Sequence, residues 1–280
     1  MSDAAREQLE HWNGPAGRRW VNEQERLDRV LAPLGALAID SAAPLAGERA
    51  VDVGCGCGAS TLELAKRVGS GGAVLGVDIS APMLARARER ARTQALSWAS
   101  FAESDATSHA FGGDADLVFS RFGTMFFADP AAAFANLRRA LRAGGGLCLL
   151  TWRRFEENEW GRVPLEAALS VLGPQPPAPP PNSPGPYSLA AEPRVRELLA
   201  AAGFTDVVLQ PVDRALEVST TGIDEAVAFS LQAGPAARVM LNADADTVAR
   251  VSAAVRKALE PYARGEHVRL GAAAWLISAG

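Results

Sequence analysis

The sequence predicts an α/β fold, a single domain built around a doubly wound, mostly parallel sheet of seven strands. Mostly apolar strand patterns alternate with helical patterns over residues 49–152, as a parallel sheet covered on both faces requires. Three glycines, Gly54, Gly56 and Gly58, follow the first strand, where such a sheet presents its ligand turn. With 280 residues, the chain is long enough to bury a sizeable core.

The chain opens with helical segments, because apolar residues recur at helical spacing through 20–39. Helices are then expected over 59–68 and over 81–92, the second with Ser80 as its N-cap. The helix over 128–141 is expected to close at Gly144, Gly145 and Gly146, since glycine suits a left-handed C-terminal turn. Five strands are expected in this half of the chain, over 49–54, 74–80, 98–106, 115–122 and 147–152.

After Trp152 the alternation breaks, and the segment 173–186 holds eight prolines in fourteen residues. Proline lacks the amide donor of a central strand, so a stiff, extended surface loop is expected, with a protein-binding proline segment as the alternative. A helix over 192–204, a strand over 205–218, helices near 223–233 and 244–264, and a final strand over 267–279 complete the chain. We therefore expect an N-terminal helical lid (1–44), a cofactor-binding core (45–153), a proline-rich and helical insertion (154–190) and a C-terminal part with a second helical insertion (191–280).

Composition excludes several classes of protein. The net charge of −4 gives no general attraction for nucleic acid, and no apolar run reaches the roughly 18–20 residues of a membrane span. The polar, acidic start is unlike a secretory signal, so a cytoplasmic protein is expected. Three cysteines rule out a disulfide framework, and His11, His109 and His267 stand too far apart for a metal-ligand spacing. No metal, membrane or nucleic-acid partner is therefore expected, and the oligomeric state is not predicted.

The glycine turn fits two cofactors. Gly54, Gly56 and Ala59 satisfy the G-x-G-x-x-A fingerprint of nicotinamide dinucleotides, and Asp78 follows at the distance of the ribose-binding acid. The alternative is S-adenosylmethionine, whose ammonium and sulfonium are attracted by a carboxylate, whereas a pyrophosphate is repelled by one. Asp52, two residues before the first glycine, therefore favours S-adenosylmethionine.

Two further acids follow the next strands of the sheet. Asp78 can accept hydrogen bonds from both ribose hydroxyls, and Asp105 can accept one from the adenine amino group. Ile79 and Met83 are candidates for the two faces of the adenine. Each acid alone is equally explained as a helix or turn cap, but three acids at the ends of three successive strands indicate a nucleoside site.

The blocks DVGCGCG, GVDIS, ESDA, ADLVFSRF and LRAGGGLCLL, in this order and spacing, resemble the signature blocks of class I S-adenosylmethionine-dependent methyltransferases. The resemblance is to the small-molecule branch that includes ubiquinone/menaquinone-type enzymes, and it covers 45–153 well and 193–218 more loosely. It implies a Rossmann-like sheet whose last strand is antiparallel. It also implies a cofactor site formed by Asp52, Gly54, Gly56, Gly58, Asp78, Ile79, Met83, Asp105, Ala106, Ser120 and Arg121.

The acceptor side is expected where the chain departs from the family's core. The expected substrate-pocket residues are mostly aromatic: Trp12, Trp20, Phe122, Met125, Phe126, Trp152 and Arg153. Plain core packing is the alternative for the aromatic run, and surface solvation for Arg153. His11 is a weak catalytic candidate, as the one histidine near the expected lid, with a polar role at a helix end as its alternative.

The function expected is S-adenosylmethionine-dependent methyl transfer to an oxygen, nitrogen or carbon of a small, partly apolar metabolite. A NAD(P)-dependent oxidoreductase and a non-methylating S-adenosylmethionine-binding protein stay open as alternatives. The fourth strand ends in FSRF (119–122) and not in the [DN]-P-P-[YF] of enzymes that methylate DNA bases, which also argues against nucleic acid as the substrate.

Overall fold

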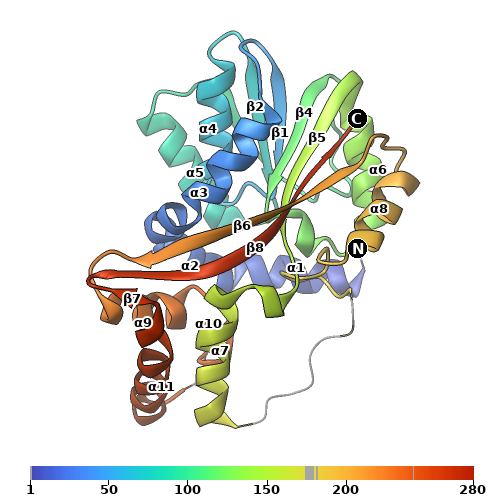
Figure 1. Ribbon diagram of the computed structural model, residues 1–280. Helices are drawn as coiled ribbons and strands as arrows, with labels where there is room; N and C mark the ends of the chain where they lie inside the picture. The colour runs from blue at the N-terminus through green and yellow to red at the C-terminus, as the bar shows by residue number, and fades with distance from the viewer. Residues whose placement is uncertain (1, 174–179, 181, 242) are drawn as a thin grey trace.

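The computed structural model describes residues 2–173, 180, 182–241 and 243–280. Its sheet has the order β3-β2-β1-β4-β5-β8-β6, and the short β7 pairs with β8 (Figure 1). The strands are β1 (Arg49–Val53), β2 (Ala73–Asp78), β3 (Ala99–Glu103), β4 (Ala115–Arg121), β5 (Leu141–Trp152), β6 (Val208–Ser219), β7 (Ala263–Arg264) and β8 (His267–Ala279).

The pairing confirms the predicted fold class. Strands β1 to β5 pair in parallel, and the last strand, β8, is antiparallel to both β5 and β6. The seven long strands are those expected from the sequence. The two-residue β7 was not expected: the helix predicted near 244–264 ends at Leu259, and a strand this short leaves no periodic pattern.

The helices are α1 (Asp3–Asn13), α2 (Pro15–Asn22), α3 (Gln24–Ala42), α4 (Ala59–Val68), α5 (Ala81–Thr93), α6 (Pro130–Ala140), α7 (Glu159–Leu172), α8 (Glu192–Ala201), α9 (Ile223–Gln232), α10 (Ala236–Val239) and α11 (Ala245–Leu259). Helices α3, α4 and α5 cover one face of the sheet, and α6 and α8 lie on the other (Figure 1). The apolar stripe of α3, which includes Val30, Leu34 and Ala38, is fully buried against the sheet. This two-sided cover explains why the parallel strands are mostly apolar.

One predicted boundary is wrong. Helix α6 ends at Ala140, and Leu141 already has extended backbone angles. The glycines at 144–146 therefore lie inside β5 and do not close the helix. Gly144 has a φ of +76°, and the register between β4 and β5 shifts just there. The glycines thus form the irregular start of β5. A run of glycines can also end a helix, and the sequence pattern does not distinguish the two.

The two helical insertions form one body. Helix α7, from the first insertion, packs on α11, from the second, and α9 and α10 join them against the outer parts of β6 and β8 (Figure 1). The predicted proline loop at 173–186 falls largely outside the described residues, at 174–179 and 181. Within the described part of the chain, no helix is long and apolar enough to cross a membrane.

Leu34 tests the packing of α3 on the sheet, because its side chain is 0% exposed. We expect Leu34→Ala to lower the free energy of unfolding by about 2–5 kcal/mol, since the cavity adds to the lost transfer energy. Urea denaturation of the free protein measures the change. The matched control is Leu45→Ala, at a side chain that is 65% exposed, which should change the value by less than about 0.5 kcal/mol. Equal effects of the two substitutions would contradict this account of the fold.

Candidate active site

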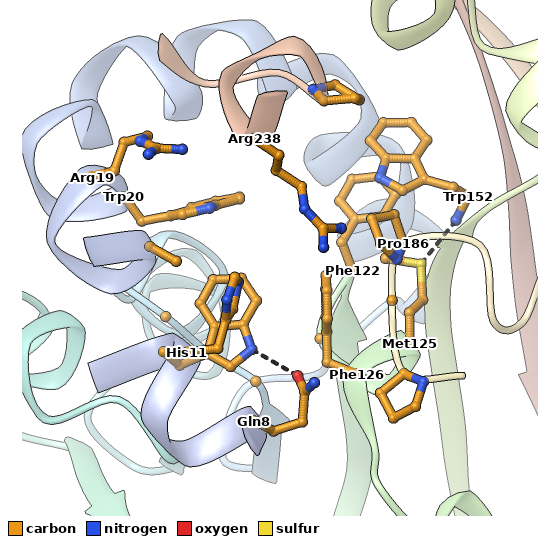
Figure 2. Close-up of a pocket in the computed structure, with 18 of the residues that line it drawn as sticks. Gln8, His11, Arg19, Trp20, Phe122, Met125, Phe126, Trp152, Pro186 and Arg238 are labelled. Atoms are coloured by element: carbon orange, nitrogen blue, oxygen red, sulfur yellow. Dashed lines mark hydrogen bonds between the residues drawn. The ribbon is translucent and has the colours of Figure 1, made fainter. Parts of the chain in front are cut away.

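A cavity of about 1720 Å³ opens at the carboxyl ends of β1 to β4. It is lined on one side by the turns that follow these strands and on the other by α1, α2 and the body of α7 and α10 (Figure 2). Parts of the chain that are far apart in sequence therefore share one space. The carboxyl edge of a parallel sheet is where such folds bind ligands.

The glycine turn exposes bare backbone to this cavity. Gly54 has a φ of +66° and Gly56 a φ of +54°, conformations that favour glycine. A Cβ on Gly54 would lie 2.6 Å from the Cα of Gly123, so no side chain fits there. Gly58 lines no part of the cavity: a Cβ at this position would lie 2.9 Å from the Cβ of Ala87, so it serves the contact of α4 with α5.

Asp52 lies behind the turn and is completely buried. Its Oδ2 accepts hydrogen bonds from Ser60 Oγ at 2.7 Å and from Thr61 Oγ1 at 2.6 Å. Its Oδ1 has no hydrogen-bond partner among the described residues. Burial raises the pKa of Asp52 to about 6, while the two hydroxyls and the charge of Arg121 oppose the rise. A half-satisfied buried carboxylate beside a bare turn is suited to a cationic ligand.

Asp78 lines the cavity at the end of β2 and holds two turns together. Its Oδ2 accepts the amide of Gly56 at 2.8 Å, and its Oδ1 accepts the amide of Ser80 at 2.9 Å. Burial raises the pKa of Asp78, and these backbone hydrogen bonds counteract the rise. Each oxygen keeps a second lone pair, so the carboxylate can still accept a pair of hydroxyls.

The predicted adenine residues lie along the same wall. Ile79, Met83, Asp105 and Ala106 all line the cavity. Asp105 Oδ1 accepts the amide of Thr107 at 2.8 Å, which fixes the turn after β3. Asp78 and Asp105 therefore line one cleft, whereas Asp52 is buried behind the glycine turn and lines no part of that cleft.

Ser120 and Arg121 differ in their positions. The hydroxyl of Ser120 is buried and donates to the carbonyl of Val53 at 2.7 Å, so this side chain ties β4 to β1 and lines no part of the cavity. Arg121 does line it, and its guanidinium lies 3.9 Å from Asp28 of α3. Burial lowers the pKa of Arg121, and the Asp28 carboxylate counteracts this.

The N-terminal helices are fastened to the end of β2. Asn13 Nδ2 donates to the carbonyl of Ile79 at 2.9 Å, and Asn13 Oδ1 accepts the amide of Ala81 at 2.9 Å. The hydroxyl of Ser80 donates to the carbonyl of Trp12 at 2.7 Å. Sequence reasoning missed Asn13. The Asn-Gly-Pro at 13–15 indicates a break between two helices, but it does not show which groups the asparagine side chain binds.

Aromatic side chains form the walls of the acceptor side. Trp12 meets Trp20 and Phe126 edge-to-face, and Phe122 stacks on Trp152 with ring centroids 3.9 Å apart (Figure 2). These five residues and Met125, all predicted from the sequence, line the cavity. Sequence reasoning missed others from the insertions and from α2, among them Arg19, Phe155, Trp160, Tyr187 and Arg238.

Arg153 does not belong to this set. Its guanidinium pairs with Asp213 at 2.9 Å and with Glu157, and it lies over the ring of Trp275. It lines no part of the cavity, so it is not placed to contact a substrate there.

His11 does line the cavity, from α1. Partial desolvation lowers the pKa of His11, and the positive charges of Arg238 and Arg19 lower it further. The imidazole is therefore neutral at pH 7 and can accept a proton.

Among the described residues, no cluster of three or more histidine, cysteine or acidic side chains is placed to hold a metal ion.

These residues fit S-adenosylmethionine. The unpartnered oxygen of Asp52 suits an ammonium, and the oxygens of Asp78 suit the two ribose hydroxyls. A nicotinamide dinucleotide would place its pyrophosphate at the glycine turn, where the carboxylate of Asp52 repels it.

The buried carboxylate makes stability depend on pH. Folded Asp52 keeps its proton up to about pH 6, whereas the unfolded chain releases it near pH 4. The folded state binds more protons between these values, so this group lowers the free energy of unfolding as pH rises through them, by roughly 2–3 kcal/mol. Urea titrations of the ligand-free protein at pH 4.5 and 7.5 should show that Asp52→Asn removes this loss. Asp246→Asn, at an exposed carboxylate, should keep it. A loss that persists in Asp52→Asn would contradict the assignment.

Comparison with known proteins identifies the family of the chain. Residues 50–145 match a family model described as a methyltransferase domain. The aklanonic acid methyltransferase DauC of Streptomyces sp. (strain C5) is 36% identical over 114 residues, 40% of this chain and 52% of that protein. Trans-aconitate 2-methyltransferase of Azoarcus sp. (strain BH72) is 32% identical over 216 residues, 76% of this chain and 73% of that protein. The chain spans only 44% to 65% of the length of the first three curated relatives that it matches.

Among solved structures, the YcgJ protein of Bacillus subtilis superposes with a TM-score of 0.57 at 16% identity, covering 88% of this chain and 96% of that one. This likeness shows a shared fold. The relative from Azoarcus matches over most of both chains, and the family match contains the glycine turn and the three acids. The chain therefore belongs to the class I S-adenosylmethionine-dependent methyltransferase family.

Proposed function

We propose that the protein transfers the methyl group of S-adenosylmethionine to an oxygen, nitrogen or carbon of a small, partly aromatic or apolar molecule. The observation that carries the proposal is that one cavity joins the glycine turn and its acids to a chamber walled by aromatic rings. A cofactor site alone would suit many proteins. A second, apolar chamber in the same space supplies the place for an acceptor.

The predicted cofactor residues beside the cavity have roles that their positions support, whereas Gly58 and Ser120 do not line it. Asp52 neutralises the cationic amino-acid tail from behind the turn, and Gly54 and Gly56 let the ligand approach the backbone. Asp78 holds the ribose hydroxyls. Asp105 and the amide of Ala106 meet the edge of the adenine, whose faces lie between Ile79 and Met83: all four residues line the cavity.

S-adenosylmethionine supplies a methyl group already activated on a sulfonium, so the protein needs no covalent intermediate. What the chain must do is align the acceptor and exclude water. Trp20, Phe126 and Trp152 bound the acceptor chamber and provide apolar surface for both tasks. His11, neutral at pH 7, is the candidate to receive the proton that a hydroxyl or amine acceptor loses.

The names of two relatives fit a small-molecule acceptor. One acts on aklanonic acid and the other on trans-aconitate, both small organic acids by name. The chamber offers no long basic groove for nucleic acid, and the chain's net charge is −4. A cytoplasmic location, where metabolites and S-adenosylmethionine meet, is part of the same proposal.

The proposal is tested by cofactor binding and by turnover. The purified protein should bind S-adenosylmethionine and not NADH in calorimetry, and it should form S-adenosylhomocysteine with at least one member of a panel of small aromatic and apolar alcohols, acids and amines. Asp78→Ala should weaken S-adenosylmethionine binding by about 1.5–3 kcal/mol, the range for lost hydrogen bonds to a charged group. Asp246→Ala, at an exposed carboxylate outside the cavity, should leave binding unchanged.

Two results would contradict it in different ways. Unchanged affinity in Asp78→Ala would remove this carboxylate from the site. Tight cofactor binding without S-adenosylhomocysteine formation across the whole panel would instead favour a protein that binds S-adenosylmethionine but does not transfer its methyl group.

A further inference from the structure

Two arginines of the acceptor chamber have no partner in the described structure. Three arginines line the cavity: Arg19 from α2, Arg121 from β4 and Arg238 from α10. Arg121 faces Asp28. The side chain of Arg19 is partly buried and that of Arg238 is exposed, and neither forms a hydrogen bond or an ion pair with a described residue. Figure 2 shows Arg238 reaching into the chamber between Trp20 and Phe126, with Arg19 beside Trp20.

The acidic side chains of the cavity do not neutralise these charges. Asp28 is engaged by Arg90 at 2.7 Å and by Arg121. Asp78, Asp105 and Asp244 each accept backbone amides close to them in sequence or at the glycine turn. Glu103 and Glu156 are exposed, and neither forms an ion pair with the two arginines. The acidic side chains therefore lie at the cofactor wall and at the rim of the cavity, whereas the two unpaired arginines lie beside the aromatic rings.

The walls beside these guanidinium groups are mostly apolar, and the amide of Gln8 and the hydroxyl of Tyr187 also line the cavity. The apolar walls are the rings of Trp12, Trp20 and Phe126 and the side chain of Pro186. Arg238 is exposed in the ligand-free protein, and an acceptor lying among these rings would displace water and so strengthen its ion pair with this arginine. The electrostatic effect of the two arginines is already felt on the neighbouring histidine, whose pKa they lower.

We propose that the methyl acceptor is an anion, with an apolar or aromatic body and a carboxylate that Arg238 binds, assisted by Arg19. This inference rests on the proposed function, since it names the class of substrate that the same site takes. A guanidinium matches a carboxylate with two parallel hydrogen bonds, so Arg238 fixes the orientation of the acceptor as well as its charge. The aromatic walls then hold the rest of the molecule.

The test measures the preference for an acid over its matched amide. Benzoate and benzamide, and 2-naphthoate and 2-naphthamide, are titrated into the protein by calorimetry, both with saturating S-adenosylhomocysteine and without it. The wild type should bind at least one acid ten or more times more tightly than its amide. Arg238→Gln should abolish this preference by weakening the acid alone, and Arg19→Gln should reduce it. Arg6→Gln, at an exposed arginine of α1 outside the cavity, should keep it.

The outcomes separate this inference from the function on which it rests. S-adenosylhomocysteine affinity, measured for each variant, should be unchanged, which also shows that the variants are folded. Binding of S-adenosylhomocysteine without any preference for an acid, or a preference that survives in Arg238→Gln, would overturn the inference and leave the methyltransferase proposal standing. Failure of the wild type to bind S-adenosylhomocysteine would overturn the proposed function itself, and the titrations without that ligand still report on the arginines.

Discussion

The carboxylate of Asp52 is held out of water in the first strand of the sheet, and the site is built around it. Removing a charge from water is costly unless the charge is paired, and here only one oxygen is satisfied, by the hydroxyls of Ser60 and Thr61. Both hydroxyls belong to the first turn of α4, so the same hydrogen bonds that hold the carboxylate fix where α4 begins. The turn between strand and helix is therefore short and bare. The other oxygen of Asp52, Oδ1, has no partner among the described residues, and we propose that the ammonium of the cofactor pairs with this carboxylate.

A second carboxylate transmits this geometry to the rest of the site. Asp78 binds an amide of the glycine turn with one oxygen and an amide of the turn after β2 with the other. Asn13 and the hydroxyl of Ser80 then join that second turn to the N-terminal helices. These hydrogen bonds attach the helices that carry Trp12, Trp20 and Arg19 to the wall of the cofactor site. Acceptor and cofactor surfaces are thus positioned by one chain of hydrogen bonds, which explains how residues far apart in sequence form a common cavity.

Local pattern was sufficient for the core and for one half of the site. The alternation of strands and helices and the glycine turn are short-range features, and the fold has them where the sequence predicts. Of the three acids, Asp78 and Asp105 line the cavity, whereas Asp52 is buried behind the turn. The arginines of the acceptor chamber were not found, because nothing local distinguishes Arg238, in a four-residue helix, from a solvated arginine. Arg153 was chosen for its position after β5, yet its neighbours across the sheet and along the chain engage it. Gly58 and Ser120 belong to the family blocks but serve packing between elements, which only the fold reveals.

The affinity for S-adenosylmethionine as a function of pH tests the role of the buried carboxylate most directly. The ammonium of the cofactor favours ionised Asp52, so binding below about pH 6 must expel a proton. Calorimetry between pH 5 and 7 should show the wild-type affinity falling about tenfold per unit below pH 6, with proton release detected as a dependence of the heat on the buffer. Asp52→Asn should bind more weakly and with no such slope. Parallel profiles for the two proteins would show that the cofactor does not depend on this charge, and would contradict the account.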